Sequence, residues 1–130
     1  MALYSELPVY RDVYRLALRV HQLTQGFARE FKYTLGQDMK RDCLQLLRDV
    51  YRINRSRERA PLLEAFLDDF ELLKLEIRMC GDLRLLTVAQ QAELAELTTS
   101  IAKQITGWRN ASLKARISPV TVDGSAPGSP

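Results

Sequence analysis

The stretch TLGQDMKRDCLQLLRDVYRIN, residues 34–54, carries the clearest helical pattern in the chain. Its apolar side chains recur at alternating steps of four and three residues, at Met39, Cys43, Leu46, Val50 and Ile53. Because an α-helix completes a turn in about 3.6 residues, these side chains form one apolar face. Thr34 and Gln37 have the spacing of a capping box, which predicts that the helix begins there. We therefore expect an amphipathic helix that packs through this face.

Three further segments repeat the same steps, at residues 8–26, at residues 60–81 and from Thr87 onwards. A second capping box, Thr87 with Gln90, is expected to begin the last of them. Their apolar faces comprise Val9, Val13, Leu16, Val20 and Leu23; Leu63, Phe66, Phe70, Leu73, Ile77 and Cys80; and Leu94, Leu97, Ile101, Ile105 and Trp108. No segment shows the alternation of a strand. Four helices of similar length with short links predict an all-α fold, an antiparallel up-down four-helix bundle.

A chain of 130 residues is the size of a single domain. We expect the bundle to occupy residues 1–117 and residues 118–130 to form a flexible tail. That tail holds three Pro, two Gly and three Ser residues, which leaves little apolar area to bury. The longest link, residues 26–33, is expected to fold back on the end of the bundle through its aromatic side chains. These are Phe27, Phe31 and Tyr33.

Several kinds of catalytic site are not expected. A di-metal carboxylate site in a bundle needs two Glu-x-x-His pairs, and the sequence has a single histidine, His21. We expect His21 to make a structural hydrogen bond, and Cys43 and Cys80 to behave as small apolar side chains. The closely spaced acids lie away from the apolar faces and are interpreted as solvated: Asp38 and Asp42, Glu64 and Asp68, and Glu93 and Glu96.

The sequence also lacks a glycine-rich phosphate loop and a nucleophile elbow. We therefore expect no enzymatic activity, no metal, no cofactor and no small-molecule substrate. No apolar run approaches the roughly 18 residues of a membrane span. Residues 1–7 lack the layout of a signal peptide. These absences predict a cytoplasmic protein that does not bind membranes.

Charge is distributed unevenly along the chain. Lys and Arg number 19 against 16 Asp and Glu, which gives a net charge of +3. Residues 1–60 contain twelve basic and seven acidic side chains, whereas residues 61–130 contain seven and nine. Such an asymmetry indicates that the first half presents a surface to a polyanion.

Arginines account for most of this positive charge. Four of them fall within an arc of about 60° on the helix of residues 34–54, opposite its apolar face. We call these the arginine row: Arg41, Arg48, Arg52 and Arg55. The first helix adds a series spaced by four, the first-helix arginines: Arg11, Arg15 and Arg19. Lys74 and Arg78 lie one turn apart late in the third helix, and Arg57 and Arg59 are expected to extend the basic surface.

The planar guanidinium of Arg suits phosphates and carboxylates, so these positions are candidate binding residues. Their pattern does not distinguish RNA from DNA, or either of them from an acidic protein. We expect contacts to the phosphate backbone, with little sequence specificity and strong salt dependence. Tyr10, Tyr14, Tyr33 and Tyr51 could stack on nucleic-acid bases, but most of them are expected to pack at the edges of the apolar faces.

Two segments add a family resemblance. Residues 32–42, KYTLGQDMKRD, and residues 101–109, IAKQITGWR, resemble the accessory variability determinant (Avd) proteins of diversity-generating retroelements. These are small four-helix proteins encoded beside reverse transcriptases, and they are related to the proteins encoded within ribosomal-RNA intervening sequences. The resemblance extends from about Leu7 to Ser112.

The resemblance implies a homopentameric barrel of bundles without catalytic activity. It implies binding to a reverse transcriptase and to RNA of the template repeat and spacer, in support of mutagenic cDNA synthesis and retrohoming. Lys74 and Arg78 then match a basic pair that serves partner binding, and the first-helix arginines contribute to the same surface. The acidic side chains Glu64, Asp68, Asp69 and Glu71 are expected to face basic groups of a neighbouring subunit.

Two alternative functions remain open on the sequence. One is a stand-alone RNA-binding or scaffold bundle of the intervening-sequence type, which has no polymerase partner. The other is a metal-dependent bundle enzyme, which would need ligands that the sequence does not obviously supply.

Overall fold

A computed structural model of the chain describes residues 3–121, and the side chains among them up to residue 115. Its elements are a 3-10 turn, η1 (Tyr4–Glu6), and the helices α1 (Pro8–Thr24), α2 (Arg29–Lys32), α3 (Leu35–Arg55), α4 (Arg59–Asp82) and α5 (Val88–Thr121). Residues 3–121 contain no strand, so the predicted all-α class is confirmed. The sequence pattern did not indicate the short elements η1 and α2.

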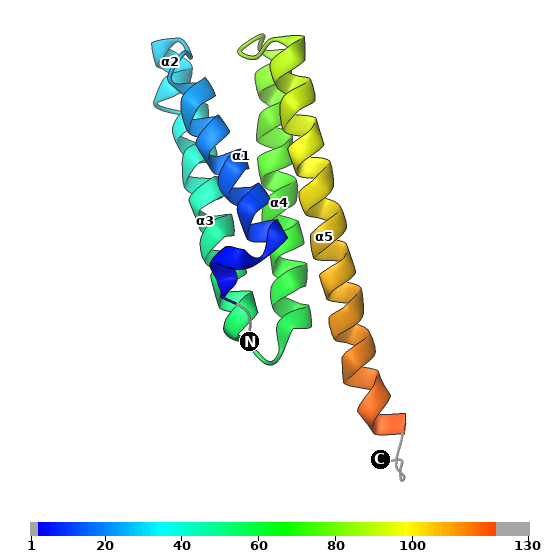
Figure 1. The fold of residues 1–130 in the computed structure, drawn as a ribbon. Helices are drawn as coiled ribbons and strands as arrows, with labels where there is room; N and C mark the ends of the chain where they lie inside the picture. Colours follow the sequence, from blue (N-terminus) through cyan, green and yellow to red (C-terminus); the bar gives the residue numbers. More distant parts are fainter. Residues whose placement is uncertain (1–2, 122–130) are drawn as a thin grey trace.

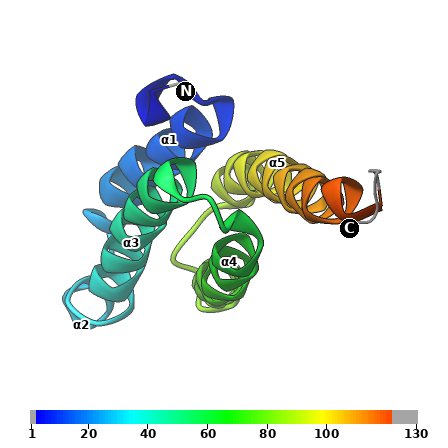
Figure 2. The ribbon, with the colours of Figure 1, turned by 90° about the horizontal axis from the view of Figure 1, so that it is seen from below.

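The four long helices alternate in direction along the chain (Figure 1). α1 packs against α3, α3 against α4 and α4 against α5, and α5 returns to pack against α1. From below, α1 and α3 form one side of this ring and α4 and α5 form the other (Figure 2). The arrangement is that of an up-down four-helix bundle, as predicted.

The predicted apolar faces form the core. On α3, all five side chains of the predicted face are at most 1% exposed. Phe66 and Phe70 of α4 are equally buried, with ring centroids 5.8 Å apart. Leu23, Leu97 and Trp108 are partly buried and pack against the same core. Burial of each large apolar side chain contributes about 1.5–3 kcal/mol, so these faces hold the four helices together.

One of the two predicted capping boxes is confirmed and the other is wrong. The Thr87 amide donates to Gln90 Oε1 at 2.9 Å, and the Gln90 amide donates to Thr87 Oγ1 at 3.1 Å. Thr34 does not cap α3 through its side chain. Its hydroxyl instead donates to the carbonyl oxygen of Glu30 at 2.6 Å, because α2 places that acceptor one turn earlier.

The link between α1 and α3 folds back on the end of the bundle, as expected. Phe27 is only 7% exposed, and Phe31 packs against the core. Tyr33, the third aromatic residue of the link, is 62% exposed and does not take part. A Cβ atom on Gly36 would lie 3.3 Å from Thr24 Cβ, so this glycine permits the close approach of α1 and α3.

Polar groups also join α1 to α5. Asp12 Oδ2 accepts hydrogen bonds from Ser100 Oγ at 2.8 Å and from Gln104 Nε2 at 2.7 Å. Arg19 Nε lies 2.7 Å from Glu93 Oε2 on the same pair of helices. We call the contact of Asp12 with Ser100 and Gln104 the Asp12 clamp. It fixes the register of the first long helix against the last.

Arg59 has a structural role that corrects its assignment to the basic surface. Its guanidinium donates to the carbonyl oxygens of Ile53 at 3.1 Å, Asn54 at 2.8 Å and Ser56 at 3.0 Å. The last carbonyls of a helix have no partner within the helix, so Arg59 satisfies the end of α3. It also lies 5.6 Å from the centroid of the Trp108 ring, which links this end to α5.

α5 is longer than the sequence pattern suggested. Its 34 residues span about 51 Å at 1.5 Å per residue. The helix continues to Thr121, past the expected end of the bundle domain at residue 117. Residues 122–130 of the expected tail lie outside the described residues. No helix between residues 3 and 121 has both the length and the hydropathy to cross a bilayer.

Candidate nucleic-acid interface

All four side chains of the arginine row are exposed on α3. The opposite face of the helix is the buried core face, so the row points outward, as its spacing predicted. Whether the row binds a ligand stays a prediction.

Carboxylates lie close to some arginines of the arginine row and not to others. Arg41 lies 3.2 Å from Asp38 and 3.9 Å from Asp42. Arg48 donates to the side-chain oxygen of Gln45. Within the described part of the chain, no carboxylate oxygen comes within 4.0 Å of Arg48 or Arg52. Arg48 and Arg52 therefore form no ion pair within this distance, although burial raises the pKa of the nearby Asp49 and their charges act to lower it.

The first-helix arginines do not form one uniform surface. Arg19 is held by Glu93 of α5 and is part of the contact between these helices. Arg15 Nη1 lies 3.7 Å from Asp12 Oδ1 but remains 71% exposed. Arg11 is exposed, and no carboxylate among residues 3–115 lies within 4.0 Å of it. Arg11 and Arg15 are thus more available to a ligand than Arg19.

Two surface hollows that share Tyr10 contain arginines, in one hollow from α1 and in the other from α3. One, of about 300 Å³, is lined by Ser5, Tyr10, Arg11, Tyr14 and Arg15. The other, of about 450 Å³, is lined by Tyr4, Tyr10, Leu47, Arg48 and Tyr51. Tyr10 belongs to both, so the two hollows adjoin. This juxtaposition depends on how α1 packs on α3 and could not be read from either helix alone.

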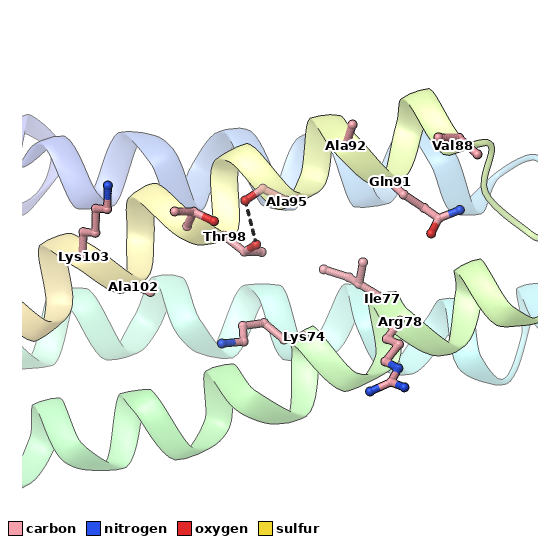
Figure 3. A pocket seen from close by; sticks show the side chains of 11 residues that line it. Lys74, Ile77, Arg78, Val88, Gln91, Ala92, Ala95, Thr98, Ala102 and Lys103 are labelled. Atoms are coloured by element: carbon pink, nitrogen blue, oxygen red, sulfur yellow. Dashed lines mark hydrogen bonds between the residues drawn. The ribbon is translucent and has the colours of Figure 1, made fainter.

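Lys74 and Arg78 lie on a different face, in a groove of about 720 Å³ between α4 and α5 (Figure 3). Its walls include apolar side chains such as Ile77, Val88 and Ala95, and Val88 is 81% exposed. Lys103 of α5 adds a third cation. Lys74 Nζ lies 2.7 Å from Glu71, and Arg78 Nε lies 4.0 Å from Asp82. We call this the α4–α5 groove.

A buried acid, Glu76, and its half-buried neighbour Asp42 were missed in the sequence. Glu76 of α4 is 7% exposed, and its Oε1 atom has no hydrogen-bond partner. Asp42 of α3, interpreted above as solvated, has a buried Oδ2 atom that also lacks a partner. Burial, followed by the hydrogen bond and the charge of Asp42, raises the pKa of Glu76 to about 8. Glu76 lies three residues from Leu73 and four from Cys80, a spacing that could have placed it on the buried face.

The histidine and the two cysteines, which were considered above for catalysis, are held in the helices as ordinary structural side chains. His21 Nδ1 donates to the Ala17 carbonyl oxygen at 2.8 Å, as expected. Cys43 and Cys80 are fully buried, and burial raises their thiol pKa values to about 12 and about 11. Reactive cysteines need a thiolate, a form that burial disfavours at both positions. Among the described residues, no group of three or more His, Cys, Asp or Glu side chains could hold a metal ion.

A protein-family model described as bAvd-like matches residues 9–112. This range runs from the beginning of α1 to well within α5, so it contains all of α3 and α4 and most of α1 and α5. It agrees with the extent of the resemblance seen in the sequence. No curated protein matches the chain.

Proposed function

Because the chain belongs to the bAvd-like family, whose members are accessory and non-catalytic proteins, we propose that it serves a diversity-generating retroelement by binding RNA and the reverse transcriptase. The proposal includes support of mutagenic cDNA synthesis from the template repeat. Its main support in the fold is the part of the arginine row without close carboxylates, Arg48 and Arg52. Exposed guanidinium groups bind phosphates through paired N–H donors.

The two basic faces suggest a division between the two partners. Arg11 and Arg15 line one hollow and Arg48 of the arginine row lines the other, and these exposed arginines suit an extended polyanion. The α4–α5 groove combines apolar walls with Lys74, Arg78 and Lys103, a combination more typical of protein recognition. We assign RNA to the first face and the reverse transcriptase to the groove.

Charge reversal tests the assignment of RNA. The variant Arg48→Glu with Arg52→Glu should weaken binding of template RNA by about tenfold or more, because phosphate contacts dominate such affinities. It should also reduce the salt dependence of binding. The measurement is fluorescence anisotropy with labelled RNA across a salt titration, with helicity checked by circular dichroism.

Lys74→Glu with Arg78→Glu is the matched control, since it changes the net charge equally on the other face. This control should keep most of the RNA affinity and lose co-purification with the reverse transcriptase. Equal weakening of RNA binding by both double variants would mean that net charge matters and the arginine row does not.

A homopentamer is the second part of the proposal, and an apolar stripe on α4 supports it. Leu72, Leu75, Met79 and Leu83 recur at steps of three and four and are 43–52% exposed. Apolar patches of this kind mark protein interfaces, because a monomer gains nothing from exposing them. The acidic side chains of the first half of α4 are exposed as well and can face a neighbouring subunit, although Glu71 already pairs with Lys74 of the same helix. Five copies would multiply weak contacts to a common RNA.

Placing two charges in this stripe should dissociate the assembly. We expect Leu75→Glu with Met79→Glu to convert a particle of five 14.9 kDa chains into monomers, measured by light scattering after size-exclusion chromatography. Leu18→Glu, at a single exposed leucine of α1, is the control and should leave the assembly intact. A wild-type protein that is monomeric at all concentrations would rule out the pentamer.

A further inference from the structure

Four tyrosines form a continuous chain of rings across η1, α1 and α3. The Tyr4 ring meets Tyr10 edge-on at 5.2 Å between centroids and meets Tyr51 edge-on at 5.0 Å. Tyr10 and Tyr14 lie 6.5 Å apart, with ring planes within 15° of parallel. We call these four residues the tyrosine face. In Figure 2 the N-terminal segment lies over the beginning of α1, at the end of the bundle where α3 finishes.

This face is open to solvent, which corrects the expectation that most tyrosines pack at the edges of the core. Tyr14 is 48% exposed, Tyr51 is 40% exposed and Tyr4 is 37% exposed. Only Tyr10 among the four packs against the core cluster. Single exposed aromatic residues are ordinary in soluble proteins, but a connected group of them offers a binding surface.

Guanidinium groups surround the rings. The hollow beside Tyr14 contains Arg11 and Arg15, and the hollow beside Tyr51 contains Arg48. Arg55 lies 5.3 Å from the Tyr51 centroid and donates to the Tyr51 hydroxyl at 2.9 Å. Neither hollow has an Asp or Glu side chain in its lining. The surface therefore suits a ligand that is both flat and apolar in parts and repeatedly anionic.

We propose that the tyrosine face binds single-stranded nucleic acid, with bases stacked on Tyr14 and Tyr51 and phosphates held by the neighbouring arginines. This inference rests on the proposed RNA binding and adds to it the form of the strand and the mode of contact. A single strand alternates flat bases with phosphates, which matches rings interleaved with guanidinium groups. A duplex hides its base faces, and an acidic peptide has no flat groups to place on the rings.

The deciding experiment compares two labelled strands of about 16 nucleotides, an oligouridylate and a strand with the same sugar–phosphate chain but no bases. The full-length protein should bind the base-bearing strand about tenfold more tightly than the abasic strand, because each stacked base adds to the affinity. Tyr14→Leu with Tyr51→Leu should abolish this difference and leave affinity for the abasic strand unchanged. Tyr14→Phe with Tyr51→Phe keeps both rings and should retain the preference for the base-bearing strand.

The possible results separate the stacking from the broader proposal. Equal binding of the two strands by wild-type protein, or a leucine variant that keeps the preference for bases, overturns the stacking. If Arg48→Glu with Arg52→Glu still weakens both strands in that case, RNA binding by the arginine row stands. If wild-type protein binds neither strand, both proposals fail. Unchanged circular dichroism in the leucine variant shows that lost preference does not reflect unfolding.

Discussion

Replacing Glu76 by Gln should remove most of the decline in stability that the bundle undergoes between about pH 5 and pH 9. Glu76 of α4 is 7% exposed and lies near enough to Asp42 of α3 for the two negative charges to repel each other. Burial is the main reason that its pKa rises to about 8, and the hydrogen bond and charge of Asp42 add to it. Asp38 raises this pKa further, whereas Arg41 lowers it.

The direction of the effect follows from proton binding. Between its usual pKa of 4.5 and the raised value of about 8, Glu76 holds a proton in the folded protein but not in the unfolded chain. The free energy of unfolding therefore falls as the pH rises through this interval and levels off above it. A shift of this size corresponds to about 5 kcal/mol over the whole interval. A glutamine stays neutral over the whole of this interval.

Urea unfolding at a series of pH values measures this pH dependence of the free energy of unfolding. Wild type and Glu76→Gln should have similar stability near pH 5, and the variant should be more stable by about 4 kcal/mol near pH 9. Glu64→Gln, at an exposed acid of the same helix, should follow the wild-type curve. Parallel curves for wild type and Glu76→Gln would show that the buried acid pair does not control the pH dependence.

Arg59→Ala should lower the free energy of unfolding by about 3 kcal/mol. The substitution leaves three carbonyl groups near the end of α3 without their charged donor. Each hydrogen bond to a charged group contributes about 1.5–3 kcal/mol, although the three are not additive. The contact with the Trp108 ring is lost at the same time.

Chemical denaturation followed by Trp108 fluorescence measures both parts of this prediction. Arg59→Lys keeps the charge but loses the forked donor, so it should recover only part of the stability. Arg57→Ala, at an exposed arginine of the same link, is the control and should change the stability by less than about 0.5 kcal/mol. If Arg57→Ala and Arg59→Ala are equally mild, Arg59 is not a capping residue.

The periodicity of the sequence was sufficient to predict the four long helices and their buried faces. Met39, Leu46 and Val50 illustrate this, because steps of three and four leave only one face on which such side chains can pack. Local capping was less predictable. Thr87 and Gln90 pair with each other as expected, whereas Thr34 finds a better acceptor in α2, a helix too short to leave a periodic signal.

Whether a charged side chain is paired, unpaired or buried depends on how the helices pack, and the sequence pattern does not predict this. Arg19 is paired because Glu93, far away in sequence, comes to lie beside it on α5. Arg48 and Arg52 have no carboxylate oxygen within 4.0 Å among the described residues, although in the sequence they resemble Arg19. Glu76 was missed because a charged residue on an apolar face is usually assumed to point outward. The role of these residues in binding stays a prediction.

The Asp12 clamp also has a consequence for the kinetics of folding. Asp12 lies 88 positions from Ser100 in the chain and 92 positions from Gln104. The contacts of α4 with α5 close much shorter loops. Closing a long loop costs more conformational entropy, so contacts of this kind generally form late, after the local helical hairpins. Interactions that are absent from the transition state act mainly on the rate of unfolding. We therefore expect the clamp to govern how long the bundle stays closed, and to have little influence on how fast it forms.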